Sequence, residues 1–161
     1  MAVNFDIQPP AAICPDTHLS IPLLAKFSDP SVQPCENLEV RLTLCDDKGN
    51  PRNNGDLIVR SIPRGEKFGY ALFKINPIGT PGSYKFRLSL CFHGRSSKSK
   101  IQDVVYSSIL RVYQGAPRHE PKVEAVRLLL NLKERINGVS QEDIAQWEEI
   151  WQAIQPTTCL P

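Results

Sequence analysis

Five cysteines and three histidines are the residues of this sequence that could act as nucleophiles, bases or metal ligands. The histidines, His18, His93 and His119, are far apart in the sequence and are expected on the surface. No CxxC pair occurs and no nucleophile motif surrounds any cysteine, although a Cys–His pair formed in space stays open. We therefore predict no enzyme activity and no cofactor, and a cysteine-dependent enzyme is the weakest alternative. The cysteines are Cys14, Cys35, Cys45, Cys91 and Cys159.

Cys45 and Cys91 share a context, because each ends an alternating segment and falls on its polar face. If the two segments are neighbouring strands, the thiols could approach one another. A metal site would need two further ligands, and the sequence offers no compact set. We interpret the pair as small, half-buried thiols. No glycine-rich phosphate loop occurs, so no small-molecule substrate is evident.

Basic residues concentrate between positions 85 and 122, a segment that contains eight Lys or Arg and only two acidic residues. If the segments 84–92 and 104–113 pair, these charges converge on one side of a sheet. Phosphate contacts need such side chains, so DNA binding is one hypothesis. The alternative is that the solvent face of a strand simply carries charge. The DNA-contacting candidates are Lys85, Arg87, Arg95, Lys98, Lys100 and Arg111.

An apolar stripe near the C-terminus is the candidate for protein interaction. Its spacing of three, seven and ten residues is helical. The two predicted helices carry more apolar surface than they can bury against each other, so either the chain's own sheet or a partner must cover it. We expect homo- or heterodimerisation or another protein partner. The candidate contacts are Ile144, Trp147, Trp151, Ile154 and, on the preceding helix, Leu129.

Strict alternation over 84–92 predicts the sheet that must position these residues, because side chains in a strand point to opposite faces in turn. Similar patterns give about seven strands, which predicts an immunoglobulin-like antiparallel β-sandwich. Pro22 makes its strand an edge or a bulged strand. In the last strand Val104, Tyr106, Leu110 and Val112 are expected on one face. The predicted strands are 3–7, 19–27, 37–45, 57–62, 68–75, 84–92 and 104–113.

The periodicity changes after Gly115. A linker and a helical hairpin are predicted for 115–161, after a sandwich domain over 1–114. The helices are expected at about 121–137 and 141–155. Ser140 is the expected N-cap of the second helix, with Asp143 three residues later.

The bulk properties are ordinary. The chain has 161 residues, of which 41% are hydrophobic and 22% charged. No apolar run has the roughly 18 residues of a membrane span, and no signal segment is evident. Together with unpaired cysteines, this predicts a non-membrane protein of the cell interior, in the nucleus or cytoplasm.

The stretch "FGYALFKINPIGTPGSYKFRLSLCF…VVYSSILRVYQGAPR" (68–118) resembles the latter part of the fungal velvet domain. An aromatic strand, a turn, "GSYKFRLSL", a basic loop and a strand ending in "VY" carry the resemblance. It implies an immunoglobulin-like fold related to Rel-type DNA-binding domains. It also implies homo- and heterodimers that regulate development and secondary metabolism. Filamin-like modules are similar to "PGSYKFRLSL" as well. We therefore predict a regulatory protein-interaction module, with DNA binding as the second hypothesis.

Overall fold

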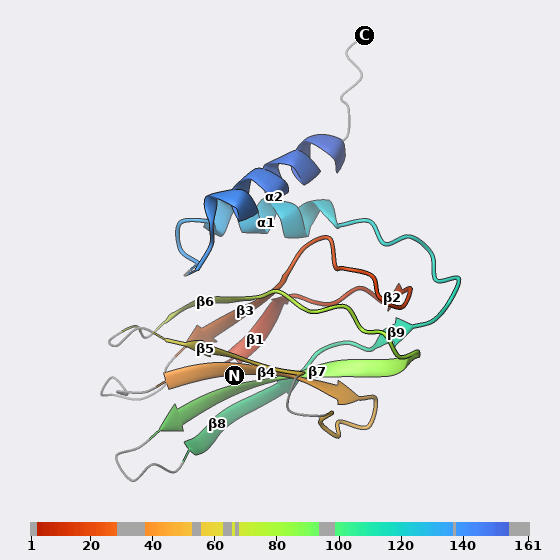
Figure 1. The fold of residues 1–161 in the computed structure, drawn as a ribbon. Coiled ribbons are helices and arrows are strands. Elements are labelled where there is room, and N and C mark those ends of the chain that lie inside the picture. The colour runs from red at the N-terminus through yellow and green to blue at the C-terminus, as the bar shows by residue number, and fades with distance from the viewer. Residues whose placement is uncertain are drawn as a thin grey trace.

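A computed structural model describes residues 3–28, 38–52, 56–62, 66, 68–93, 99–136 and 138–154. Within β-strands it leaves the side chains at positions 92, 93, 99, 100 and 102 undescribed. The chain forms two β-sheets followed by two helices (Figure 1). The predicted mainly-β sandwich with a C-terminal helical pair is therefore confirmed.

The smaller sheet has three antiparallel strands in the order β1-β3-β6. They are β1 (Val3–Ile7), β3 (Leu23–Ser28) and β6 (Phe68–Phe73). The strand predicted at 19–27 thus begins after Pro22. The expectation of an edge strand is wrong, because β3 pairs on both sides. Proline lacks the N–H that a central strand needs, and the chain places it just before the ladder.

The larger sheet has six strands in the order β2-β9-β7-β4-β5, with β8 also paired to β7. All its pairs are antiparallel except β2 with β9. A short strand at Ala12–Ile13 escaped prediction. The members are β2 (Ala12–Ile13), β4 (Leu38–Asp46), β5 (Leu57–Ser61), β7 (Gly82–His93), β8 (Ser99–Tyr106) and β9 (Leu110–Val112).

Alternating side chains of β7 form the centre of the core between the sheets. Tyr84, Phe86, Leu88 and Leu90 are buried, and they pack against residues from the other sheet such as Phe27. Burying each such side chain stabilises the fold by roughly 1.5–3 kcal/mol. The tightly alternating segment is thus the central strand of the larger sheet.

Tyr84 fixes the entry into β7. Its hydroxyl donates a 2.6 Å hydrogen bond to the carbonyl oxygen of Thr80, four residues upstream. The same bond, from a tyrosine near the start of a strand back to the preceding corner, is a hallmark of immunoglobulin-type sandwiches. The Arg52 guanidinium lies 5.1 Å from the ring centroid and covers its exposed side.

The strand predicted at 104–113 is broken in two by residues 107–109. At Ser107 a side-chain bond replaces one main-chain bond: its Oγ accepts a hydrogen bond from the Phe86 N–H (2.9 Å), while its own N–H donates to the Phe86 carbonyl oxygen (2.8 Å). The three intervening residues change the alternation. Leu110 and Val112 are buried as expected, whereas Tyr106 is 42% exposed and Val105 packs on the core. The prediction that Val104 and Tyr106 share one face with Leu110 and Val112 is therefore wrong.

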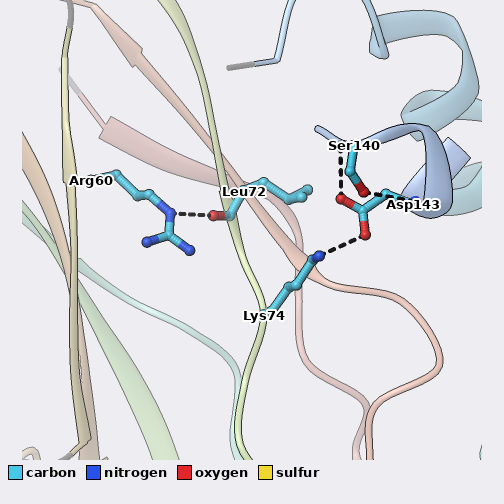
Figure 2. Close-up of polar contacts among 5 residues, drawn as sticks. All are labelled: Arg60, Leu72, Lys74, Ser140 and Asp143. Carbon is cyan, nitrogen blue, oxygen red and sulfur yellow. Dashed lines mark hydrogen bonds and ion pairs between the residues drawn. The ribbon is translucent and has the colours of Figure 1, made fainter. Parts of the chain in front are cut away.

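Arg60 joins the two sheets at one edge of the sandwich. Its Nε donates a 3.1 Å hydrogen bond to the carbonyl oxygen of Leu72 (Figure 2). Its guanidinium also lies 5.7 Å from the ring centroid of Phe73. Arg60 belongs to β5 and the other two residues to β6, so the bond links the larger sheet to the smaller one.

The helices are α1 (Val123–Leu132) and α2 (Gln141–Ile154). The helix predicted to reach position 137 ends at Leu132 because the chain turns to bury Ile136, which forms a parallel bridge with Tyr70 of β6. Gly138 then takes a positive φ of 85°, a conformation that glycine adopts at little cost, and the chain enters α2.

Both helices cover the outer side of the smaller sheet (Figure 1). Outward-facing residues of that sheet, Ile7, Leu24 and Leu72, form one buried cluster with Val126 and Leu129 of α1. The helical pair is thus joined to the sandwich by a hydrophobic core of its own. Among the described residues, no helix is long and apolar enough to cross a membrane.

Candidate functional site

The predicted interaction stripe on the helices packs largely against other parts of the same chain. Trp147 is 2% exposed and Leu129 is fully buried, and both belong to the cluster between the helices and the smaller sheet. Trp151 and Ile154 pack at the border of this cluster and are half-buried, as is Ile144. The prediction that Trp147 and Leu129 contact a partner is wrong, because the chain's own sheet covers them.

Polar contacts fix α2 in this position. Ser140 and Asp143 form the predicted capping box: the Asp143 N–H donates to Ser140 Oγ (3.1 Å), and the Ser140 N–H donates to Asp143 Oδ2 (3.0 Å). Lys74, just after β6, places its Nζ 2.6 Å from the other carboxylate oxygen (Figure 2). Both carboxylate oxygens of Asp143 thus have partners within the chain.

The opposite side of the molecule carries the basic residues. Cross-strand pairing brings Lys85 and Arg87 of β7 to the outer face of the larger sheet, and Arg111 of β9 lies opposite Ser83 of β7 on that face. The sequence-based convergence of these three cations is therefore present. Arg95 and Lys98 fall outside the described residues. Lys100 pairs in β8, but its side chain is not described.

Exposed apolar side chains flank these cations on both sides. Register places Leu57 and Val59 of β5 opposite Thr43 and Arg41, on the outer face, and they are 43% and 39% exposed. On the other side Ile101 is 56% exposed. We call this surface the open face. Its members are Arg41, Leu57, Val59, Lys85, Arg87, Ile101, Tyr106 and Arg111.

The cations of the open face differ in their partners. Arg41 pairs with Glu39 at 3.0 Å, and Lys85 Nζ lies 4.5 Å from the ring centroid of Tyr106. Arg87 Nε is buried and has no hydrogen-bond partner in the described part of the chain. An unsatisfied buried donor on a cation costs about 1–3 kcal/mol or more. Arg87 is therefore a cation of this face whose charge no described acidic side chain neutralises.

Small side chains lie along the open face beneath the long ones. Thr43, Ser89, Cys45 and Cys91 are all buried there. The suggested approach of the two thiols does not occur. The antiparallel register places Cys45 opposite Lys85 and Cys91 opposite Glu39, six positions apart along the strands and thus roughly 20 Å.

The thiols of Cys45 and Cys91 lack the lowered pKa of a cysteine nucleophile. Burial raises the pKa of Cys45 and of Cys91 above the ordinary value, and the nearby arginine charges only partly oppose this effect. A nucleophilic cysteine needs the reverse, a lowered pKa. Cys45 and Cys91 therefore act as small packing residues beneath the open face.

Cys14 lies closer to imidazoles than the sequence suggested. It lines a cavity of about 350 Å³ together with His18 and His119. Its thiol donates to the carbonyl oxygen of Ala116 (3.5 Å). In the part of the chain that the structure describes, no three His, Cys, Asp or Glu residues are grouped to hold a metal ion.

Sequence reasoning missed the apolar members of the open face. Ile101 lies just outside the predicted strand 104–113, and Leu57 and Val59 belong to an apolar run without clear alternation. One signal was present in that run: "LIV" at 57–59 places apolar residues on both faces of one strand. A strand buried on one side does not need this, so a second contact surface could have been inferred.

No protein-family profile matches the sequence, and no curated protein is similar to it.

Proposed function

We propose that this chain is a non-enzymatic protein-interaction module that contacts its partner through the open face. Protein contact surfaces are enriched in tyrosine, arginine and apolar side chains at their centre. The open face combines Tyr106, Arg87 and exposed aliphatic residues over several strands. Three of its aliphatic side chains, at positions 57, 59 and 101, are each more than a third exposed.

The position of Arg87, which has no ion-pair partner among the described residues and lies between the exposed side chains of Leu57 and Tyr106, is the observation that carries this proposal. A carboxylate accepts two parallel hydrogen bonds from a guanidinium, which is the strongest pairing available to it. The partner surface is therefore an acidic side chain flanked by apolar ones. The carboxylate contacts Arg87, and the apolar groups cover Val59 on one side and Ile101 on the other.

A second copy of the chain fits this face less well. In a symmetric homodimer the same patch meets itself. Lys85, Arg87 and Arg111 form no ion pair with any described residue, so such a dimer would oppose like charges. We therefore infer a different, acidic partner, and in the velvet-like interpretation a heterodimeric regulator of the nucleus or cytoplasm.

DNA is the competing ligand for the same cations. Phosphate contacts would use Lys85, Arg87 and Arg111, but they would leave the aliphatic residues without a role. The exposed apolar area favours a protein, and DNA binding becomes an outcome of the test.

Site-specific photo-cross-linking tests the proposal. A benzoylphenylalanine at position 59 or 101 should form protein adducts in cell extract, and the same group at Glu149, on the exposed side of α2, should not. Arg87→Met should remove the adducts, whereas Arg127→Met, which changes a cation on α1, should leave them. Adducts that persist in Arg87→Met, or form only from position 149, contradict the proposal.

Two further measurements separate the alternatives. Light scattering should give a monomer mass. A dimer that is lost in Ile101→Asp would instead show that the partner is a second copy of the chain and not a different, acidic protein. Retention on duplex DNA at low salt that falls steeply with added salt, and that is lost in Lys85→Met and Arg111→Met, would assign the face to nucleic acid.

A further inference from the structure

A sizeable cavity lies away from the open face. It has a volume of about 690 Å³ and opens between the end of β1, the segment before β3, the β8–β9 connection and the start of α1. Volumes of about 300–1,000 Å³ are typical of sites for small organic molecules. Its size therefore suits a ligand of one or two rings rather than a peptide.

The floor of the cavity is apolar. Ile7, Ile21 and Leu23 are buried beneath it, and Leu128 of α1 forms one side. These side chains belong to the cores that hold the helices and sheets together. The floor is thus fixed by the fold, and an apolar group that enters the cavity is removed from water against a preformed surface.

The walls are held in place by local contacts. Pro9 and Pro10 restrict the backbone between β1 and β2. The Gln8 Oε1 accepts hydrogen bonds from the N–H (3.0 Å) and the hydroxyl (3.4 Å) of Ser108. Two segments 100 residues apart in the chain are thereby joined at the cavity, so little ordering is needed when a ligand binds.

Charges at the mouth of the cavity are mainly negative. Asp6, Glu120 and Glu124 line it together with Lys122. Burial raises the pKa of Asp6, and the positive charge of nearby Lys26 partly opposes this effect. Partial burial, and then the charge of Lys122, lower the pKa of His119, so its imidazole is neutral at neutral pH. The N-terminus of α1 adds a partial positive charge, which Glu124 in the first turn offsets. The mouth therefore favours a cation.

We propose that this cavity binds a small organic cation: an aromatic or short aliphatic body on the apolar floor, with an ammonium group at the carboxylates of the mouth. The proposal is independent of the open face, because no residue that lines the cavity belongs to that face. The cavity differs from a surface patch of carboxylates because it combines a buried apolar floor with an acidic mouth.

Three matched probes test this inference by calorimetry or ligand-observed NMR at neutral pH. They are 2-phenylethylamine, its neutral analogue 2-phenylethanol and the anionic 3-phenylpropionate. The amine should bind about tenfold more tightly than the alcohol, because only the amine gains the charge interaction. The carboxylate should bind most weakly. Equal binding of all three, preference for the carboxylate, or no binding of the amine at about 10 mM overturns the proposal.

Variants locate the binding. Glu124→Gln with Asp6→Asn should weaken the amine about three- to tenfold and leave the alcohol unchanged. Ile109→Trp fills the cavity from a side chain that is 39% exposed, so the fold should survive, and it should remove binding of both ligands. Glu149→Gln on α2 is the control and should change neither. A folded Ile109→Trp protein, checked by thermal melting, that retains full affinity places the ligand elsewhere and refutes the assignment.

Discussion

Lys74 Nζ lies 2.6 Å from Asp143 Oδ1, so a residue that follows β6 is joined to the first turn of α2. The same carboxylate also accepts the Ser140 N–H through Oδ2. One side chain thus caps a helix and anchors it to the sandwich. These contacts explain why Asp143, a charged residue at the edge of an apolar cluster, is only 6% exposed.

Asp143→Ala should lower the free energy of unfolding by about 1–3 kcal/mol, because it removes a helix cap and leaves Lys74 and the Ser140 N–H without their acceptor. Lys74→Met should cost less, about 1 kcal/mol or below, because the lysine side chain is 61% exposed. Urea denaturation measures both. Glu149→Ala on the same helix is the control, and a loss in Asp143→Ala no greater than in this control would contradict the anchoring role.

The same carboxylate should contribute to the acid sensitivity of the fold. Burial alone would raise the pKa of Asp143, but the hydrogen bonds from Lys74 and Ser140 outweigh it and the pKa lies below the ordinary value. A lowered native pKa gives stability that is present above the unfolded pKa of about 3.9 and is lost as pH falls through the native value. The stability difference between wild type and Asp143→Asn should be constant near neutral pH and shrink below about pH 4. A difference that stays constant in acid would refute this linkage.

Trp147→Ala should destabilise the protein by about 3–5 kcal/mol, because it leaves a cavity between α1, α2 and the smaller sheet. Trp151→Ala should cost clearly less. Trp151 is half-buried, and Arg127 lies 5.6 Å from its ring centroid in a cation–π contact worth roughly 0.5–1 kcal/mol. Denaturant midpoints of the two variants give the comparison. Equal losses would mean that the cluster extends over both tryptophans alike.

Native Cys45 and Cys91 should react slowly with iodoacetamide at neutral pH. Both are buried, and burial raises the pKa of each thiol, so little thiolate is present. The half-buried Cys14 should be alkylated faster, and all three should react at similar rates in denaturant. Mass spectrometry of the peptides follows each site. Rapid native labelling of Cys45 or Cys91 would reopen the hypothesis of a cysteine nucleophile.

Local patterns were sufficient to predict most elements. The alternation from Tyr84 to Phe92 predicted β7, and Ser140 with Asp143 predicted the start of α2, because each pattern depends on neighbours only a few residues away. The end of α1 was predicted too late because Ile136 leaves the helix to join β6, a long-range contact. The face of Tyr106 was predicted wrongly for a related reason: the Ser107 side chain bonds to the main chain of β7, and the predicted strand breaks between β8 and β9.

The sequence by itself determined that a layered sheet body precedes two amphipathic helices, because side-chain periodicity follows from backbone geometry. It also determined which residues are basic and which are apolar. Only the tertiary structure decided that the smaller sheet covers Trp147 and that the cations share a face with Leu57, Val59 and Ile101. Strand order and register join residues far apart in the chain, and a register change of one residue reverses the face of every side chain.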